Sequence, residues 1–232
     1  MAISGSMQPT CLFMMRISLV ITLWMMAIGL RAQTKDAGLW MDVGFSQDVG
    51  ERFELTISPE IRFDENLTRW SRLFADAAIE YKHNKRISLS AAYRAGVAND
   101  GVYIDGRHRV QYGLGLKEKW NDWSVQFQSR IQFALNAAWS DADVDFNSTW
   151  RNRLTVKYGG LKKTDLATSY EIFNAVSAYQ NLAFTNWRWT AQIARKINKK
   201  QSVVLGYLIQ RDLTESPQHL DYVFLLSYKV EL

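Results

Sequence analysis

The sequence predicts an all-β protein: an up-and-down antiparallel transmembrane β-barrel of ten to twelve strands, preceded by a cleaved signal peptide. Three observations carry this prediction. Apolar and polar residues alternate along many long runs of the chain, and an apolar segment with the features of an export signal precedes those runs. Short and long connections also alternate between the runs, as in outer-membrane barrels with short periplasmic turns and longer extracellular loops.

The segment 52–64 shows the alternation most clearly. Its apolar row extends from Phe53 to Phe63, and its polar row extends from Arg52 to Asp64. Because successive side chains of a strand point to opposite faces, this segment has one oily face and one charged face. It is about as long as a tilted strand needs to be to cross a bilayer. A single such run is also typical of a soluble antiparallel sheet, so the repetition decides the class.

Eleven runs with this pattern follow one another along the chain. They cover residues 39–49, 52–64, 72–81, 87–97, 109–117, 123–133, 150–158, 165–172, 187–193, 203–209 and 222–232. Single-chain bacterial barrels have an even number of strands, so we favour twelve. An odd count leaves three explanations open: a merged or wrongly assigned run, an amino-terminal segment inside the lumen, or a parallel closure between the first and last strands.

The connections between the runs indicate which end of the barrel faces which side of the membrane. Short connections, expected at the periplasmic end, lie near Gly50, Asn84, Asn121, Gly160 and Lys199, and longer ones, expected outside, lie near Trp70, Asp100, Asp143, Tyr179 and Pro217. The last run ends on Leu232 with Tyr228 inside it, and it resembles the carboxy-terminal signal by which such barrels are recognised for insertion. We therefore expect outer-membrane lipids and, during insertion, the barrel-assembly machinery as partners.

The amino-terminal part of the chain has the features of an export signal. Arg16 precedes an apolar core over 17–30, and Ala32 supplies a small residue at a plausible cleavage point. A transmembrane helix is the alternative, but the core is short and no basic stop-transfer cluster follows it. The predicted division is therefore a signal peptide over 1–32, including an upstream extension, and an outer-membrane barrel over 33–232.

Composition excludes several functional classes. The one cysteine, Cys11, precedes the apolar core, so the expected mature chain has no disulfide, no thiolate metal site and no lipid-attachment cysteine. The net charge is +5, but Lys and Arg are spread through the chain and form no basic stripe, which argues against nucleic acid as a partner. We expect no metal and no cofactor.

Hydropathy and aromatic content both fit a membrane barrel. The mean hydropathy of −0.21 would suit a soluble protein. A barrel strand, however, turns only every second residue to lipid, so this value does not contradict the prediction. Aromatic residues make up 13% of the chain, as expected if girdles of Trp and Tyr lie at the two membrane interfaces.

The polar face of the runs is predicted to line the lumen. Its charged members are Glu54, Glu60, Arg62, Arg72, Asp76, Glu80, Arg94, Arg109, Arg130, Arg151, Arg153 and Glu171. Opposite charges on neighbouring strands can pair into a plug that stiffens the barrel. The functional alternative is a narrow polar pore whose excess of arginine favours anions. Gly113 and Gly115 on the same face leave local space or let a neighbouring long side chain lie flat.

A second candidate site lies in the predicted outward loops. It combines Asp141, Asp143, His219 and Asp221. Carboxylates beside a His–Asp pair can activate water, so an outer-membrane hydrolase is an alternative function. No motif around these residues matches a known outer-membrane protease, and catalytic activity is not the favoured expectation. A surface binding or adhesion barrel, using aromatic and acidic loops, is a third hypothesis.

Three short motifs resemble a known family. They are Leu39-Trp40 in the first run, Glu60-Ile61-Arg62-Phe63 at the end of the second, and His108-Arg109 after the second outward loop. The chain is similar here to uncharacterised outer-membrane β-barrels of Gram-negative bacteria that carry a domain of unknown function. The resemblance implies location in the outer membrane and a barrel over nearly all of the mature chain. It implies no activity, so no catalytic residue is carried over.

Overall fold

The computed structural model describes residues 37–137, 144–176, 183–214 and 220–232. Eleven β-strands lie in these ranges: β1 (Ala37–Val49), β2 (Phe53–Asp64), β3 (Arg69–Lys82), β4 (Ile87–Asn99), β5 (Ile104–Trp120), β6 (Trp123–Ala137), β7 (Val144–Leu161), β8 (Thr164–Val176), β9 (Ala183–Lys196), β10 (Gln201–Asp212) and β11 (Leu220–Glu231). The predicted signal peptide lies outside the described residues. Within the part described, no helix is long and apolar enough to cross a membrane.

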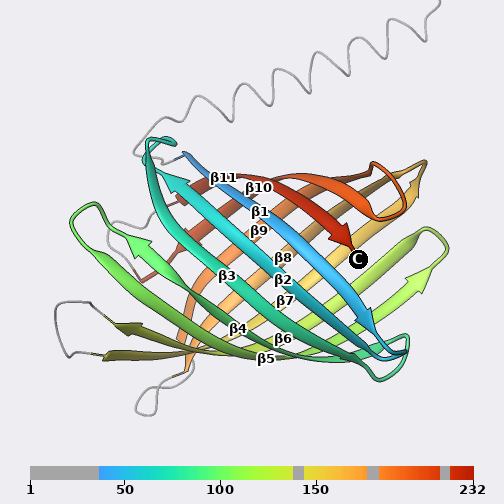
Figure 1. The fold of residues 1–232 in the computed structure, drawn as a ribbon, viewed down its shortest axis with the longest axis horizontal. Coiled ribbons are helices and arrows are strands. Elements are labelled where there is room, and N and C mark those ends of the chain that lie inside the picture. Colours follow the sequence, from blue (N-terminus) through green and yellow to red (C-terminus); the bar gives the residue numbers. More distant parts are fainter. Residues whose placement is uncertain (1–36, 138–143, 177–182, 215–219) are drawn as a thin grey trace, which may run out of the picture. The chain divides into compact units, whose positions relative to one another are not determined.

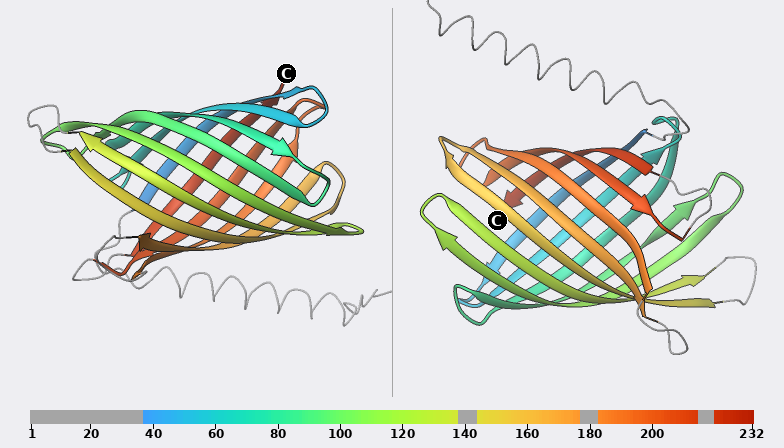
Figure 2. Two further views of the ribbon diagram at one scale, coloured as in Figure 1. Left: turned by 90° about the horizontal axis from the view of Figure 1, so that it is seen from below. Right: turned by 180° about the vertical axis from the view of Figure 1, so that it is seen from behind.

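The strands form one closed barrel (Figures 1 and 2). Each strand from β2 to β11 pairs antiparallel with the strand before it in the sequence. The closure is different, because β1 pairs with β11 in parallel, with Val43 opposite Tyr228. In Figure 1 the blue β1 and the red β11 run side by side in the same direction.

The prediction of an all-β barrel of ten to twelve strands is confirmed, but the preference for twelve is wrong. The described residues form a barrel that closes with eleven strands. A sheet edge carries unpaired N–H and C=O groups, and these need partners when water is excluded. The parallel ladder from Ala37 to Ser46 supplies those partners for both edges. No twelfth strand is then needed, and the closure departs from a purely up-and-down antiparallel barrel.

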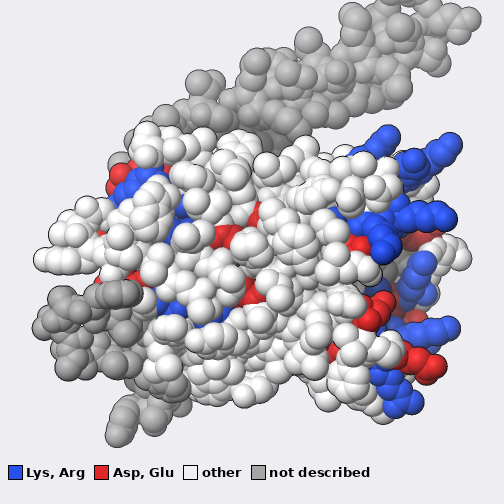
Figure 3. All heavy atoms as spheres, in the orientation of Figure 1, with Lys and Arg blue, Asp and Glu red and all other residues white. Residues whose placement is uncertain are grey.

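Alternation of the side chains gives the barrel its two faces. In β2 the apolar residues Leu55 and Ile57 are 43% and 57% exposed on the outside. The polar residues between them are half-buried and point into the barrel. The same contrast recurs around the barrel, and the exposed large hydrophobic residues of the middle of the strands lie on its outer face. In Figure 3 the sides of the barrel are correspondingly mostly white.

The two ends of the barrel differ in their connections. At one end, called here the turn end, the connections are residues 50–52, 83–86, 121–122, 162–163 and 197–200. Gly50 adopts a φ of +66°, a left-handed conformation that glycine accepts without a steric cost. Lys and Arg side chains gather at the turn end, on the right in Figure 3. The other end, called the loop end, includes the turns 65–68 and 100–103.

A small apolar core lies inside the barrel, mainly along β10 and β11. Val204, Leu208 and Val223 are 7%, 2% and 4% exposed. The middle of these two strands is therefore apolar on both faces. It forms an apolar part of the lumen wall, whereas most of the remaining wall is polar or charged.

Candidate functional site in the barrel lumen

The lumen contains a polar cavity of about 850 Å³. Its lining extends along the barrel, from Lys157 and Lys229 toward the turn end to Asn186 and Asp212 toward the loop end. Among the described residues that line it, ten are Lys or Arg and six are Asp or Glu, an excess of four positive charges. This excess makes the cavity the strongest candidate for a functional site.

The first half of the cavity wall is built by β2, β3 and β4. Arg94 makes a two-pronged contact with Asp76 through its Nε, at 2.7 Å, and its Nη2. The Nε of Arg62 donates to Glu60 at 2.6 Å. The register explains the first pair, because Asp76 lies directly opposite Arg94 on the neighbouring strand. Such two-pronged charged hydrogen bonds fix side-chain geometry as well as lowering the free energy.

Glu171 organises the second half of the wall. It is 2% exposed, and both of its oxygens accept hydrogen bonds from Arg151, from Nε at 3.1 Å and from Nη2 at 2.8 Å. Arg130 donates to the same carboxylate at 2.6 Å, and Arg188 approaches it to 3.7 Å. One carboxylate thus holds arginines from β6, β7 and β9.

Aromatic side chains join the two halves. The guanidinium of Arg62 lies 3.5 Å from the ring centre of Trp40, and that of Arg188 lies 5.0 Å from the same ring. Trp40 therefore bridges arginines of β2 and β9 by cation–π contacts. Elsewhere Phe74 lies under Arg94, at 3.4 Å, and Phe173 lies under Arg151, at 4.4 Å.

On the opposite side, amides connect β5 to β6, where Gln132 donates to Gln111 at 2.7 Å. The side chains therefore form a band around the lumen, called here the arginine belt. It consists of the arginines and the three carboxylates that contact one another or share the same wall: Arg62, Arg94, Arg109, Arg130, Arg151, Arg153, Arg188, Glu60, Asp76 and Glu171.

Gly113 shows how the sequence makes room for the belt. It lies opposite Arg130, and a Cβ placed on it would come within 3.1 Å of the Cγ of Arg130 and 2.6 Å of the Ser90 hydroxyl. The glycine therefore lets the stem of Arg130 lie flat against the wall. A Cβ placed on Gly115 would lie 2.6 Å from the Ser88 hydroxyl, so this glycine makes room for Ser88 and not for an arginine.

Several belt arginines keep unused hydrogen-bonding capacity. Among the described residues, the enclosed Nε atoms of Arg109, Arg130 and Arg153 have no hydrogen-bond partner. The contact of Arg109 with a carboxylate is loose, 3.8 Å to Asp76. Arg153 donates to the neutral amide of Gln128. An enclosed N–H of a charged group without a partner is costly, so these positions favour an added acceptor.

The structure places most of the predicted lumen residues on this cavity. Those that line it are Glu60, Arg62, Arg72, Asp76, Arg94, Arg109, Arg130, Arg151, Arg153 and Glu171. Glu54 and Glu80 lie outside the cavity lining and face each other near the turn end, where Glu54 contacts Lys82 at 2.7 Å. Arg72 also lines the cavity and is exposed to solvent.

The predicted loop site is not brought together by the described residues. Asp141, Asp143 and His219 lie outside them. Asp221 is part of β11, opposite Gln210 of β10. Over the described part of the chain, no group of three or more His, Cys, Asp or Glu side chains is placed to hold a metal ion.

Sequence reasoning missed three contributors to the site. Arg188 lies on the inward row of its run, so the alternation alone would have placed it in the lumen. Trp40 and Phe173 also point inward. The alternation places both on the inward rows of their runs, in phase with Asp42 and Glu171. Aromatic residues are expected at the membrane interfaces, so this signal was not used to assign the two to the lumen.

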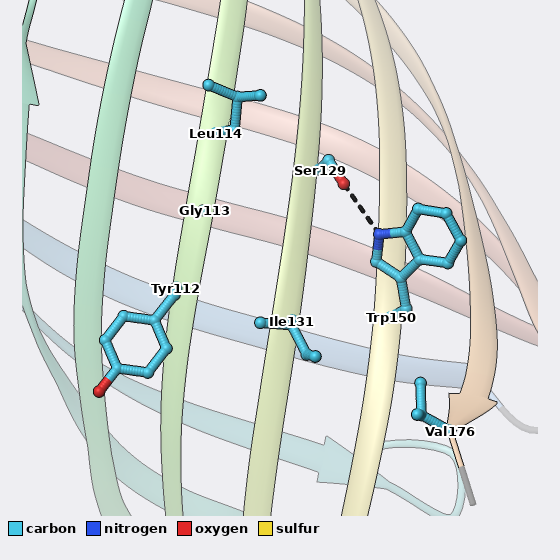
Figure 4. Close-up of a pocket in the computed structure, with 7 residues that line it drawn as sticks. All are labelled: Tyr112, Gly113, Leu114, Ser129, Ile131, Trp150 and Val176. Atoms are coloured by element: carbon cyan, nitrogen blue, oxygen red, sulfur yellow. Dashed lines mark hydrogen bonds between the residues drawn. The ribbon is translucent and has the colours of Figure 1, made fainter.

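A second hollow lies on the outer face, across β5 to β8 (Figure 4). It measures about 460 Å³ and is lined mainly by apolar side chains, with one polar contact from the indole N–H of Trp150 to the Ser129 hydroxyl at 2.8 Å. This contact gives the indole N–H of Trp150 an acceptor on the outer face. The hollow carries no charge and is not the candidate site.

Comparison with known proteins gives a family match and similar solved structures. The family model described as "Protein of unknown function (DUF2490)" matches residues 37–220. No curated protein is significantly similar to the chain. Among solved structures, the β domain of the Bordetella autotransporter BrkA is similar, with a TM-score of 0.49 and 13% identity over 80% of this chain and 86% of that chain.

Proposed function

This chain belongs to the DUF2490 family of proteins of unknown function, and we propose that its barrel is a narrow anion-selective pore of the bacterial outer membrane. The observation that carries the proposal is the polar cavity along the barrel, with its excess of positive charge. The proposal has two parts, the membrane location and the selectivity, and a different set of residues supports each part.

The outer face supports the membrane location. It exposes rows of large apolar side chains, including Leu55, Leu114 and Phe224, whose exposed fractions are 43%, 40% and 53%. Soluble monomers rarely expose contiguous apolar patches of more than a few hundred Å². Toward the turn end, Trp123 packs against Tyr158 at 4.8 Å between ring centres, and Phe53 packs against Tyr81 at 5.2 Å. Aromatic pairs near a strand end fit the interfacial girdle of a membrane barrel.

The charges of the lumen support anion selectivity. Rings of Arg and Lys side chains favour anions in a pore because they lower the electrostatic energy of a negative ion within it. The basic turns add to this effect, since Lys85, Lys163 and Lys200 lie on three different connections at the same mouth. A charged mouth raises the local concentration of counter-ions. We place the turn end in the periplasm, because outer-membrane barrels have their short connections there.

Planar-bilayer recording tests the proposal. We expect small, steady chloride currents, and a reversal potential that shows a preference for anions over cations in a salt gradient. Replacing Arg109 and Arg153 by Gln removes two belt charges that lack close carboxylate partners, so the preference for anions should fall. Arg86→Gln is the matched control, because this arginine is on a turn with a 72% exposed side chain.

Three results would contradict parts of the proposal. Absence of current at every voltage from a correctly folded barrel would reject the pore and leave a structural membrane component cross-linked by its ion pairs. Current with no preference for anions would reject the role assigned to the arginine belt. A control variant that changes selectivity as much as the belt variant would assign selectivity to the mouth.

A further inference from the structure

We propose that the arginine belt binds a phosphate-type oxyanion on the wall formed by β5, β6 and β7, with Arg109, Arg130 and Arg153 as its ligands. The inference rests on the proposed function in one respect, because it requires a lumen that admits small solutes. It goes further by assigning a binding site and the chemical class of its ligand.

The charge balance of the belt is the first argument. Three carboxylates, those of Glu60, Asp76 and Glu171, serve the seven belt arginines named above. An excess of positive charge in a partly dehydrated lumen is unfavourable, since like charges repel more strongly where the dielectric constant is low. A bound anion of two negative charges would offset part of the excess without any change in the protein.

The distribution of hydrogen bonds places the site on one side of the belt. On the β3–β4 side, the fork of Arg94 is satisfied by Asp76. On the β5–β7 side, Nε atoms of three arginines lack partners among the described residues. Arg109 has a carboxylate oxygen no closer than 3.8 Å, and Arg153 donates to the neutral Gln128. The arginine N–H groups that lack an acceptor therefore lie on three neighbouring strands, β5, β6 and β7.

The register brings two of these arginines close together. Arg153 lies opposite Gln128 on β6, and Arg130 is two residues further along β6, on the same inward face. Gly113, opposite Arg130, lets the stem of Arg130 lie flat against the β5 wall. Arg109 lies on that same inward row of β5. Arg153 of β7 therefore lies next to Arg130, whereas Arg109 is four residues before Gly113 on β5, so its side chain meets the same anion when extended along the strand.

Guanidinium chemistry defines the ligand. Arginine presents its N–H groups as a planar fork that matches the oxygen spacing of phosphate and carboxylate. Several arginines around one position favour a ligand with several oxygens and more than one charge. The cavity of about 850 Å³ is larger than inorganic phosphate needs, so a small phosphorylated solute also fits. A halide ion offers no pair of oxygens to the fork and should bind far more weakly.

Calorimetry on the purified, detergent-solubilised protein tests the site, with inorganic phosphate as the probe and chloride as the background salt. We expect saturable binding of one phosphate per barrel. Arg109→Gln and Arg153→Gln should each weaken it about tenfold, the loss expected when one charged hydrogen-bonding partner of about 1.4 kcal/mol or more is removed. Arg86→Gln, on an exposed turn, should leave binding unchanged. Faster migration of unboiled protein on a denaturing gel verifies that each variant is folded.

Each outcome decides one claim. No saturable phosphate binding to the folded protein would overturn the site, even if chloride currents are present and the pore stands. Binding that the Arg109 and Arg153 variants leave intact would overturn the assignment to the β5–β7 wall. Phosphate binding with no current would support the site and reject the pore. Chloride current that phosphate blocks in the original protein, but not in the Arg153 variant, would support both.

Discussion

Glu171 is the side chain on which the most belt arginines depend. Arg130 and Arg151 donate to it, and Arg188 lies 3.7 Å away, so one carboxylate links β6, β7 and β9 to β8. Removing one partner of a buried charge cluster is costly, because the remaining charges stay in a place of low dielectric constant without compensation. Glu171 is therefore the best position for measuring how much the belt contributes to the stability of the barrel.

We expect Glu171→Gln to lower the free energy of unfolding by about 3 kcal/mol, because the isosteric amide keeps the volume but leaves the arginines without their counter-charge. Denaturant unfolding followed by tryptophan fluorescence measures the change. Glu118→Gln is the matched control, since Glu118 pairs with the exposed Arg86 and is itself 38% exposed. A surface pair of this kind contributes at most about 1 kcal/mol. Equal effects of the two substitutions would contradict a special role for Glu171.

Asp100 provides a pH-dependent prediction at the loop end. Its carboxylate accepts the backbone N–H groups of Tyr103 and Val102, and these hydrogen bonds hold its pKa below the ordinary value of 3.8. A lowered pKa means that the carboxylate stabilises the turn above its ordinary pKa and that this contribution is lost as pH falls through the lowered value. The amide proton shifts of Val102 and Tyr103, followed by NMR, should titrate with a midpoint below 3.8.

Asp100→Asn is the natural control for this titration. The amide oxygen can still accept the two N–H groups, but the side chain no longer ionises. The amide shifts should then be independent of pH over the same range. A midpoint at or above the ordinary value of 3.8 in the original protein would show that the backbone hydrogen bonds do not persist in solution.

At the scale of elements, the contact between β1 and β11 determines the strand count. The ladder is parallel, and the Ser227 hydroxyl donates to Asp42 across it at 2.7 Å. A parallel closure joins the edges of the first and last strands when the number of strands is odd. Alternation within each run cannot report this contact, because the pattern says which face a residue lies on but not which strand lies beside it.

A double substitution tests the parallel closure. Val43→Cys together with Tyr228→Cys places two thiols on opposed positions of the outer face, so a disulfide should form on mild oxidation. The control is the pair Leu39→Cys with Val230→Cys. Leu39 is opposite Phe224, which lies six residues before Val230 on β11, so these two thiols are too far apart to form a disulfide. Mobility on a non-reducing gel reads out the cross-link. If the first pair does not cross-link in a folded barrel, the parallel closure is wrong.

The apolar wall along β10 and β11 corresponds to a local break in the alternation. Residues 203–205 and 222–226 are continuously apolar, a pattern typical of strands buried on both faces. In the barrel the inward members Val204 and Val223 are buried. The lumen wall is thus mainly charged along β2 to β9 and apolar at the middle of β10 and β11, so a solute in it meets two different surfaces.

For the whole molecule, the closed network of backbone hydrogen bonds should make the barrel resistant to detergent. All edges are paired in the described barrel, so no strand is free to peel away. We expect unboiled protein to migrate faster than boiled protein on a denaturing gel, because the folded barrel stays compact. Identical migration of the two samples would contradict a stable closed barrel. The Glu171→Gln variant should lose the compact band at a lower temperature.

The family membership agrees with the resemblance carried by the short motifs. The expected resemblance to an uncharacterised family with a domain of unknown function is confirmed by the match over residues 37–220, a range that contains all three motifs. The motifs mark the architecture and not an activity. They include Arg62 and Arg109, which both line the lumen cavity.

The sequence by itself determined the class of fold and the two faces of each strand, because the side-chain period of a strand is two and a residue's face follows from its position in the run. The alternation alone therefore places Arg62, Arg94 and Glu171 on the inward face. The tertiary structure alone decided how many strands close the barrel, since closure depends on contact between the two ends of the chain. It also decided that Glu171 is shared by arginines of three strands and that Trp40 connects one of these, Arg188, to Arg62, because such contacts depend on register and on side chains that reach across the lumen.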